Sequence, residues 1–87
     1  EAVAKYYNID KEDFNISRRS NDIAFPRQIA MYLAKQLTGQ PLADIGKSFG
    51  GRDHTTVIYA INKIEASMKN NPNTRMIVDN IKKTILS

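Results

Sequence analysis

Residues 50–56 read GGRDHTT and separate two short amphipathic segments. Glycine adopts backbone angles that other residues avoid, so Gly50 and Gly51 predict a sharp turn. Asp53 comes next and can offer a side-chain oxygen to the N–H groups at the start of a new helix, which is the role of an N-cap. This stretch therefore predicts a tight turn that leads directly into a helix N-terminus.

The helix after the turn is predicted over about residues 54–68, with one apolar and one polar face. Its apolar positions recur at helical spacing and predict a buried stripe of Val57, Ala60, Ile61, Ile64 and Met68. At about 100° per residue, the opposite face carries Thr55, Tyr59, Asn62 and Lys63. His54 and Thr56 flank this face at its exposed tip. A polar tip after a glycine turn is typical of a recognition helix, which fits the DNA major groove, about 12 Å wide.

Helical periodicity continues on both sides of this pair. A long central helix is expected from about residue 23 to 38, with Pro26 in its first turn and with a core stripe of Ala30, Leu33, Ala34 and Leu37. A short helix over residues 41–49 directs Leu42, Ile45 and Phe49 inward. The last helix starts near Asn73 and buries Ile77, Ile81 and Ile85, and residues 1–8 also read as a helix. No segment alternates like a strand, so we expect an all-α fold, a small helical bundle with a helix-turn-helix at about 42–68.

Composition and charge narrow the functional class. The 87 residues suit a single domain over 1–87, and the absence of cysteine excludes a disulfide framework. No apolar run reaches the roughly 20 residues of a membrane span. The net charge is +4, with a pI of about 9.5, and residues 16–63 hold seven basic residues against three acidic ones. This excess is either a solubilising surface or a nucleic-acid footprint. Because the chain begins at Glu1 without an initiator methionine, we expect it to be part of a longer protein.

The tip of the predicted recognition helix has competing interpretations. Asp53 is an N-cap, or an acceptor from the amino group of cytosine, or one half of a catalytic pair with His54. The pair is disfavoured because adjacent helical residues point about 100° apart. His54 is the only histidine and there is no cysteine nucleophile, so we expect neither an enzyme nor a metal site. Thr55 and Thr56 either cap the first turn or, with His54, contact base edges.

Basic residues elsewhere suggest contacts to the DNA backbone. Arg18 and Arg19 lie in a polar loop over residues 15–22, which is either solvated or a finger that enters a minor groove. Near the start of the long helix, Arg27 and Gln28 favour a phosphate contact. Further candidate backbone contacts are Lys47, Arg52, Tyr59 and Lys63.

The motif GGRDHTTVIYAINKI resembles the signature of the C-terminal DNA-binding domains of the bacterial DnaA replication initiators. The flanking segments also resemble parts of these domains. The basic loop and the long helix of the family correspond to RRSNDIAFPRQIAMYLAKQLT, and the first helix of its helix-turn-helix corresponds to PLADIGKSFG. The likeness covers about residues 2–86. It implies a Trp-repressor-like helix-turn-helix that binds DnaA boxes of the TTATCCACA type in double-stranded DNA at the replication origin.

The resemblance also assigns roles to residues. It implies major-groove base contacts by Asp53, His54, Thr55 and Thr56 and a minor-groove contact by Arg19. It implies backbone contacts at Arg27, Gln28, Lys35, Leu42, Ala43 and Arg52. Asn21 is uncharged where some relatives carry arginine, which puts the strength of the minor-groove arm in question, and Ala43 replaces a frequent proline at a helix start.

No cofactor is expected in this domain, because the family's ATP-binding module lies outside this chain. We expect a monomer in the cytoplasm, associated with the nucleoid. Two other functional classes stay open: a generic helix-turn-helix repressor, which would be a dimer, and a protein-binding helical adaptor, which would show no salt-dependent affinity for DNA.

Overall fold

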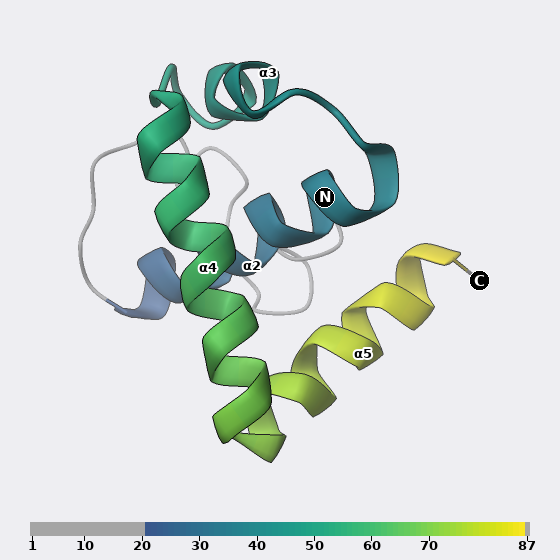
Figure 1. Ribbon diagram of the computed structural model, residues 1–87. Helices are drawn as coiled ribbons and strands as arrows, with labels where there is room; N and C mark the ends of the chain where they lie inside the picture. Colours follow the sequence, from purple (N-terminus) through teal and green to yellow (C-terminus); the bar gives the residue numbers. More distant parts are fainter. Residues whose placement is uncertain (1–20, 87) are drawn as a thin grey trace.

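The computed structural model describes residues 21–86, which form four α-helices (Figure 1). Their bounds are Asn21–Thr38 for α2, Leu42–Ser48 for α3, His54–Asn70 for α4 and Pro72–Leu86 for α5. No strand occurs within this part of the chain, and none of its helices is both long and apolar enough to cross a bilayer. The expected all-α bundle with a helix-turn-helix is confirmed. The helix expected at residues 1–8 lies outside the described residues.

Helix α4 is the centre of the bundle and packs against the other three helices. It crosses α2 and meets α5 at its C-terminal end, while α3 lies beside its N-terminal end (Figure 1). The predicted stripe of α4 is confirmed, because Val57, Ala60 and Ile64 are buried and Ile61 and Met68 are partly buried against the core. The rest of the buried core comprises Ile29, Ala30, Met31, Leu33, Ile45, Phe49, Val78 and Ile81.

The position of Pro26 differs from the prediction. Helix α2 begins at Asn21 rather than near residue 23, so Pro26 lies in its second turn and not in its first. The N–H that proline lacks would have bonded to the carbonyl of Asp22, so one intrahelical hydrogen bond is lost. The Pro26 side chain is fully buried, and burial of the ring offsets part of that loss.

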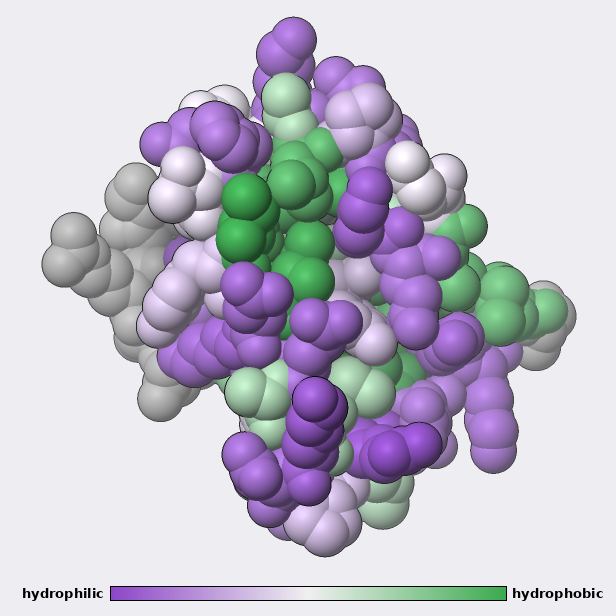
Figure 2. Space-filling model, viewed as in Figure 1, coloured by the Kyte–Doolittle hydropathy of each residue, from purple (hydrophilic) through white to green (hydrophobic). Residues whose placement is uncertain are grey.

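The buried face of α5 also differs from the prediction. Ile81 is buried and Ile77 is half-buried as expected, but Ile85 is 41% exposed. The buried face of α5 contains Thr74 and Val78 as well as Ile81. The Thr74 hydroxyl is buried with a hydrogen-bond partner, since Thr74 Oγ1 and Ser67 Oγ of α4 are 2.8 Å apart. Ile85 and Leu86 leave apolar surface exposed at the C-terminal end of α5, and hydrophobic atoms are visible on the right of Figure 2.

The turn between α3 and α4 depends on the two predicted glycines and on a third glycine, Gly46 of α3, which was not predicted. Gly50 and Gly51 have φ angles of 86° and 77°, which confirms the predicted sharp turn. The N–H groups of Phe49 and Arg52 both donate to the carbonyl of Gly46, at 3.1 and 2.9 Å. A Cβ atom at Gly46 would lie 2.0 Å from the Arg52 carbonyl oxygen. The chain therefore folds back onto α3 at a position that only glycine permits.

Candidate nucleic-acid interface

Asp53 caps the N-terminus of α4. Its backbone is extended, with φ −79° and ψ 168°, and its Oδ1 atom accepts hydrogen bonds from the N–H of Thr56 at 3.0 Å and from Thr56 Oγ1 at 3.1 Å. The predicted N-cap is confirmed. These two bonds hold the pKa of the Asp53 carboxyl below its usual value, with a smaller contribution from the charge of His54. The cap is therefore an anion at neutral pH.

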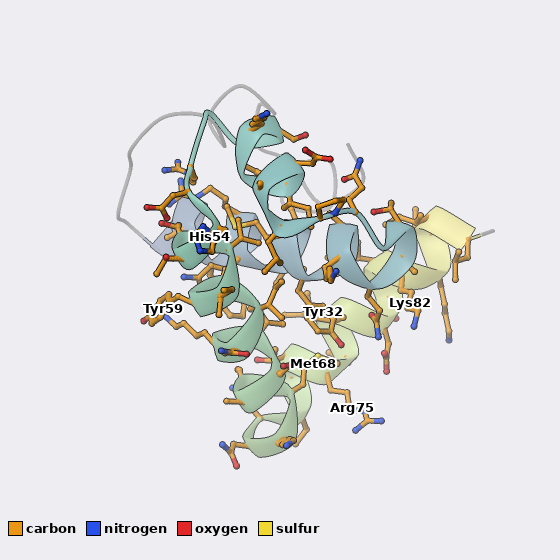
Figure 3. The ribbon with its side chains drawn as sticks, turned by 45° about the horizontal axis from the view of Figure 1, so that its top comes forward. Tyr32, His54, Tyr59, Met68, Arg75 and Lys82 are labelled. Atoms are coloured by element: carbon orange, nitrogen blue, oxygen red, sulfur yellow. The ribbon has the colours of Figure 1, made fainter. Side chains whose placement is uncertain are left out.

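The first turn of α4 is an exposed polar tip. Asp53, His54, Thr55 and Thr56 are consecutive and all exposed, and His54 lies at the end of α4 that meets the turn (Figure 3). The hydroxyl proton of Thr56 is used by the cap, but the oxygen still has lone pairs and the methyl group stays available. The capping interpretation of Thr56 is thus confirmed, while base reading by these four residues stays a prediction.

The exposed face of α4 continues the tip with an aromatic residue and a cation. Tyr59 is 62% exposed, and the ammonium group of Lys63 lies 5.9 Å from the centroid of its ring. This is a cation–π geometry one helical turn apart, and at an exposed site it is weak, about 0.5–1 kcal/mol. Both side chains are exposed, so both remain accessible to a phosphate.

Two arginines from different elements lie close together beside this tip. Arg27 comes from α2 and Arg52 from the turn before α4, and both are half-buried. Burial lowers the pKa of Arg27, and the positive charge of Arg52 lowers it further. Arginine stays charged even so. The pKa shift shows that the charge of Arg52 acts on Arg27, so two cationic side chains from different elements lie on the same side of the molecule.

Gln28 follows Arg27 and is also half-buried. Its Oε1 atom is buried and has no hydrogen-bond partner within the described part of the chain. The side chain is therefore packed against the bundle on its oxygen side, and its phosphate contact stays a prediction.

A second group of predicted backbone contacts gathers at the other end of α2. Lys35 Nζ donates to the carbonyl of Gln40 at 3.3 Å, which brings the ammonium group close to the start of α3. There the N–H groups of Asp44 and Ile45 donate to the Pro41 carbonyl. The N–H groups of Leu42 and Ala43 precede these bonds and so belong to the first turn, which has no intrahelical acceptors. Lys47 is exposed in the last turn of α3.

Some predicted residues are not covered and one positioning residue was missed. Arg18 and Arg19 lie outside the described residues, so their proposed contacts stay predictions. Gly46 was not singled out, although a signal exists: glycine within a helix costs about 1 kcal/mol relative to alanine, and its presence in a helix as short as α3 indicates a close backbone approach. No cluster of three or more potential metal ligands occurs within residues 21–86.

The chain matches a model of a known protein family. A family model described as the bacterial DnaA protein helix-turn-helix matches residues 1–64. The matched region contains α2, α3, the glycine turn, the polar tip and more than half of α4. It ends before α5.

Proposed function

The chain belongs to the bacterial DnaA helix-turn-helix family, a family of DNA-binding domains that act in replication initiation, and we propose that it recognises DnaA boxes at the replication origin. The proposed sites are double-stranded boxes of the TTATCCACA type. The observation that carries the proposal is the capped, fully exposed tip at Asp53–Thr56, which stands directly after a turn with two glycines of positive φ. Residues 1–87 act in this proposal as one domain and as a monomer.

The tip of α4 is proposed to enter the major groove. Asp53 accepts a hydrogen bond from a cytosine amino group, because a carboxylate has about four lone-pair sites and the cap occupies only part of them. His54 donates or accepts at a base edge. The methyl groups of Thr55 and Thr56 pack against thymine methyl groups.

The basic residues around the tip are proposed to hold the sugar–phosphate backbone at two places. Arg27, Gln28 and Arg52 bind phosphate beside the tip, where guanidinium groups can form charge-assisted hydrogen bonds with phosphate oxygens. Lys35 and the main-chain N–H groups of Leu42 and Ala43 bind phosphate at the far end of α2. Lys47, Tyr59 and Lys63 add weaker contacts, and the loop over residues 15–22 directs Arg19 into the adjacent minor groove, with Arg18 on the backbone.

A fluorescence anisotropy titration at matched salt tests this function with a DnaA-box duplex and a scrambled duplex of the same composition. We expect tighter binding to the box. His54→Ala should cost about 1–3 kcal/mol on the box and much less on the scrambled duplex. Arg75→Ala on α5 is the control and should change neither. Equal affinity for the two duplexes would refute box recognition. A DNA affinity that does not change with salt concentration would refute the backbone contacts.

A further inference from the structure

A groove of about 420 Å³ lies between α2, α4 and α5, away from the polar tip. Its apolar lining comes from Tyr32 of α2 and Met68 of α4, which are half-buried, while Val78 of α5 is almost fully buried. In Figure 3, Tyr32 lies near the middle of the molecule, and Met68 and Arg75 lie farther from His54. The volume falls within the range of about 300–1,000 Å³ that ligand pockets occupy. The groove is therefore large enough to receive one or two side chains of a partner.

Charged side chains form the rim of this groove. Lys69 and Arg75 stand on the two sides of the junction between α4 and α5, and Glu65 and Asp79 lie four residues, about one turn, farther from it. Lys82 follows on α5. None of these five side chains forms an ion pair with another described residue. The rim thus offers a positive end at the junction, then a negative band, then a further cation.

We infer that this groove docks a peptide segment of another protein in which an acidic residue stands next to an apolar one. The carboxylate binds Lys69 and Arg75 at the junction, and the apolar side chain rests on Tyr32 and Met68. The negative band accepts hydrogen bonds from the backbone N–H groups of the peptide. The inference goes beyond DNA binding and does not depend on it.

The mixed rim favours a peptide over a nucleic acid. A phosphate backbone repeats one negative charge along its length, so Glu65 and Asp79 in the middle of the groove would repel it. It also gains nothing from an apolar floor. A peptide carries a separate carboxylate, an apolar group and N–H donors, and each of these has a counterpart in the groove.

The groove and the polar tip lie at opposite ends of α4. Fifteen residues separate His54 from Lys69 along the helix, which corresponds to about 22 Å. A peptide in the groove therefore leaves the tip uncovered, and this domain can hold DNA and a partner protein at the same time.

Amide chemical shifts of the ¹⁵N-labelled 87-residue chain test the inference. The probes are four acetylated and amidated tetrapeptides with a glutamate at each end and Leu-Phe, Leu-Leu, Phe-Phe or Ile-Leu between them. The matched controls carry lysine in place of glutamate. We expect at least one acidic peptide to shift the amides of residues 65–82 in a saturable way, with those of His54–Lys63 unchanged, and no response to the lysine peptides. The same shifts should persist after a DnaA-box duplex has been added.

Two exposed variants separate charge recognition from nonspecific adhesion. Arg75→Glu together with Lys69→Glu should weaken the acidic peptide at least tenfold, while Glu65→Gln in the same groove should leave the affinity unchanged or raise it. All variants should keep the thermal unfolding midpoint within a few degrees. The inference is overturned if no acidic peptide shifts these amides at millimolar concentration, if the lysine peptides shift them equally, or if the duplex itself occupies the groove.

Discussion

Asp53 uses a single carboxylate oxygen to hold both the N–H and the hydroxyl of Thr56. Asparagine caps a helix about as well as aspartate, so Asp53→Asn separates the cap from the charge. We expect far-UV circular dichroism and the unfolding midpoint to stay the same. Discrimination should relax at one base pair, because the amide can donate as well as accept and no longer selects the cytosine amino group.

Titrations against all single-base variants of the box measure this effect. Asp53→Ala is the complementary variant, since it removes the cap and the carboxylate together. If Asp53→Asn discriminates at every position as the original chain does, Asp53 is only a cap.

The same carboxylate predicts how stability depends on pH. Its pKa is lowered in the folded state by the bonds from Thr56, so the charged form is favoured by folding. That contribution is fully present above the unfolded pKa of about 3.9 and is lost as the pH falls through the lower, folded pKa. The difference in unfolding midpoint between the original chain and Asp53→Ala should therefore be largest near pH 6 and shrink below pH 4. Thermal melts across this range check it, and a difference that grows on acidification would contradict the assignment.

At the scale of elements, the helix-turn-helix depends on the approach of Arg52 to Gly46. In an open helix, Gly46→Ala would stabilise α3 by about 1 kcal/mol. Here the new Cβ atom would meet the Arg52 carbonyl oxygen at 2.0 Å, and backbone cannot move aside cheaply. We expect a loss of about 1–3 kcal/mol in the free energy of unfolding, on the scale of overpacking. Box affinity should fall too, because the turn positions Asp53.

Urea unfolding gives the magnitude, and Gly51→Ala is the matched control. Gly51 has a positive φ of 77°, but a Cβ atom there would meet open space. Gly51→Ala should therefore lower the free energy of unfolding by about 1–2 kcal/mol through backbone strain alone. A Gly46→Ala variant that is more stable than the original chain would show that the close approach does not occur.

The elements differ in how well local sequence predicts them. The stripe of α4 and its cap were predicted because a 3.6-residue period and an N-cap are local properties. The buried face of α5 was not, since Ile85 fits the apolar period but is exposed, while the polar Thr74 is buried with its hydroxyl bonded to Ser67 of a different helix. Gly46 was missed for a similar reason, because its need for glycine comes from Arg52 across a turn.

For the whole molecule, the arrangement of charge is what sequence could not give. The sequence identified Arg27 and Arg52 separately as phosphate contacts, but only the fold places the turn before α4 near enough to α2 for the charge of Arg52 to act on Arg27. Arg52→Ala should weaken binding to box and scrambled duplexes by a similar factor and reduce the slope of log K against log salt by about 1. Arg75→Ala removes the same charge from α5 and should leave the slope unchanged. A loss confined to the box would make Arg52 a base reader instead.

The last prediction concerns Arg19 and depends on how distant parts of the chain meet. Thirty-four positions separate Arg19 from Asp53. However, α2 begins at Asn21, and the charge of Arg52 contributes to the lowered pKa of Arg27 on this helix. The start of α2 is therefore within about two helical turns of Arg27, the proposed phosphate contact beside the tip. We expect the loop before α2 to overhang the neighbouring minor groove. A·T-rich sequence narrows that groove and deepens its negative potential, which favours an inserted guanidinium group.

Arg19→Ala should accordingly weaken box binding by about 1 kcal/mol or more, on the scale of a base contact. The loss should shrink when the A·T pairs at the T-rich end of the box become G·C, because guanine adds an amino group to the floor of the minor groove. Arg18→Ala is the neighbouring control and should cost less, acting through salt-dependent attraction alone. Anisotropy titrations of both variants on both duplexes measure the four losses. Equal losses for Arg18 and Arg19 on box and G·C-substituted DNA would mean that the loop contributes only diffuse positive charge, and the minor-groove contact would have to be abandoned.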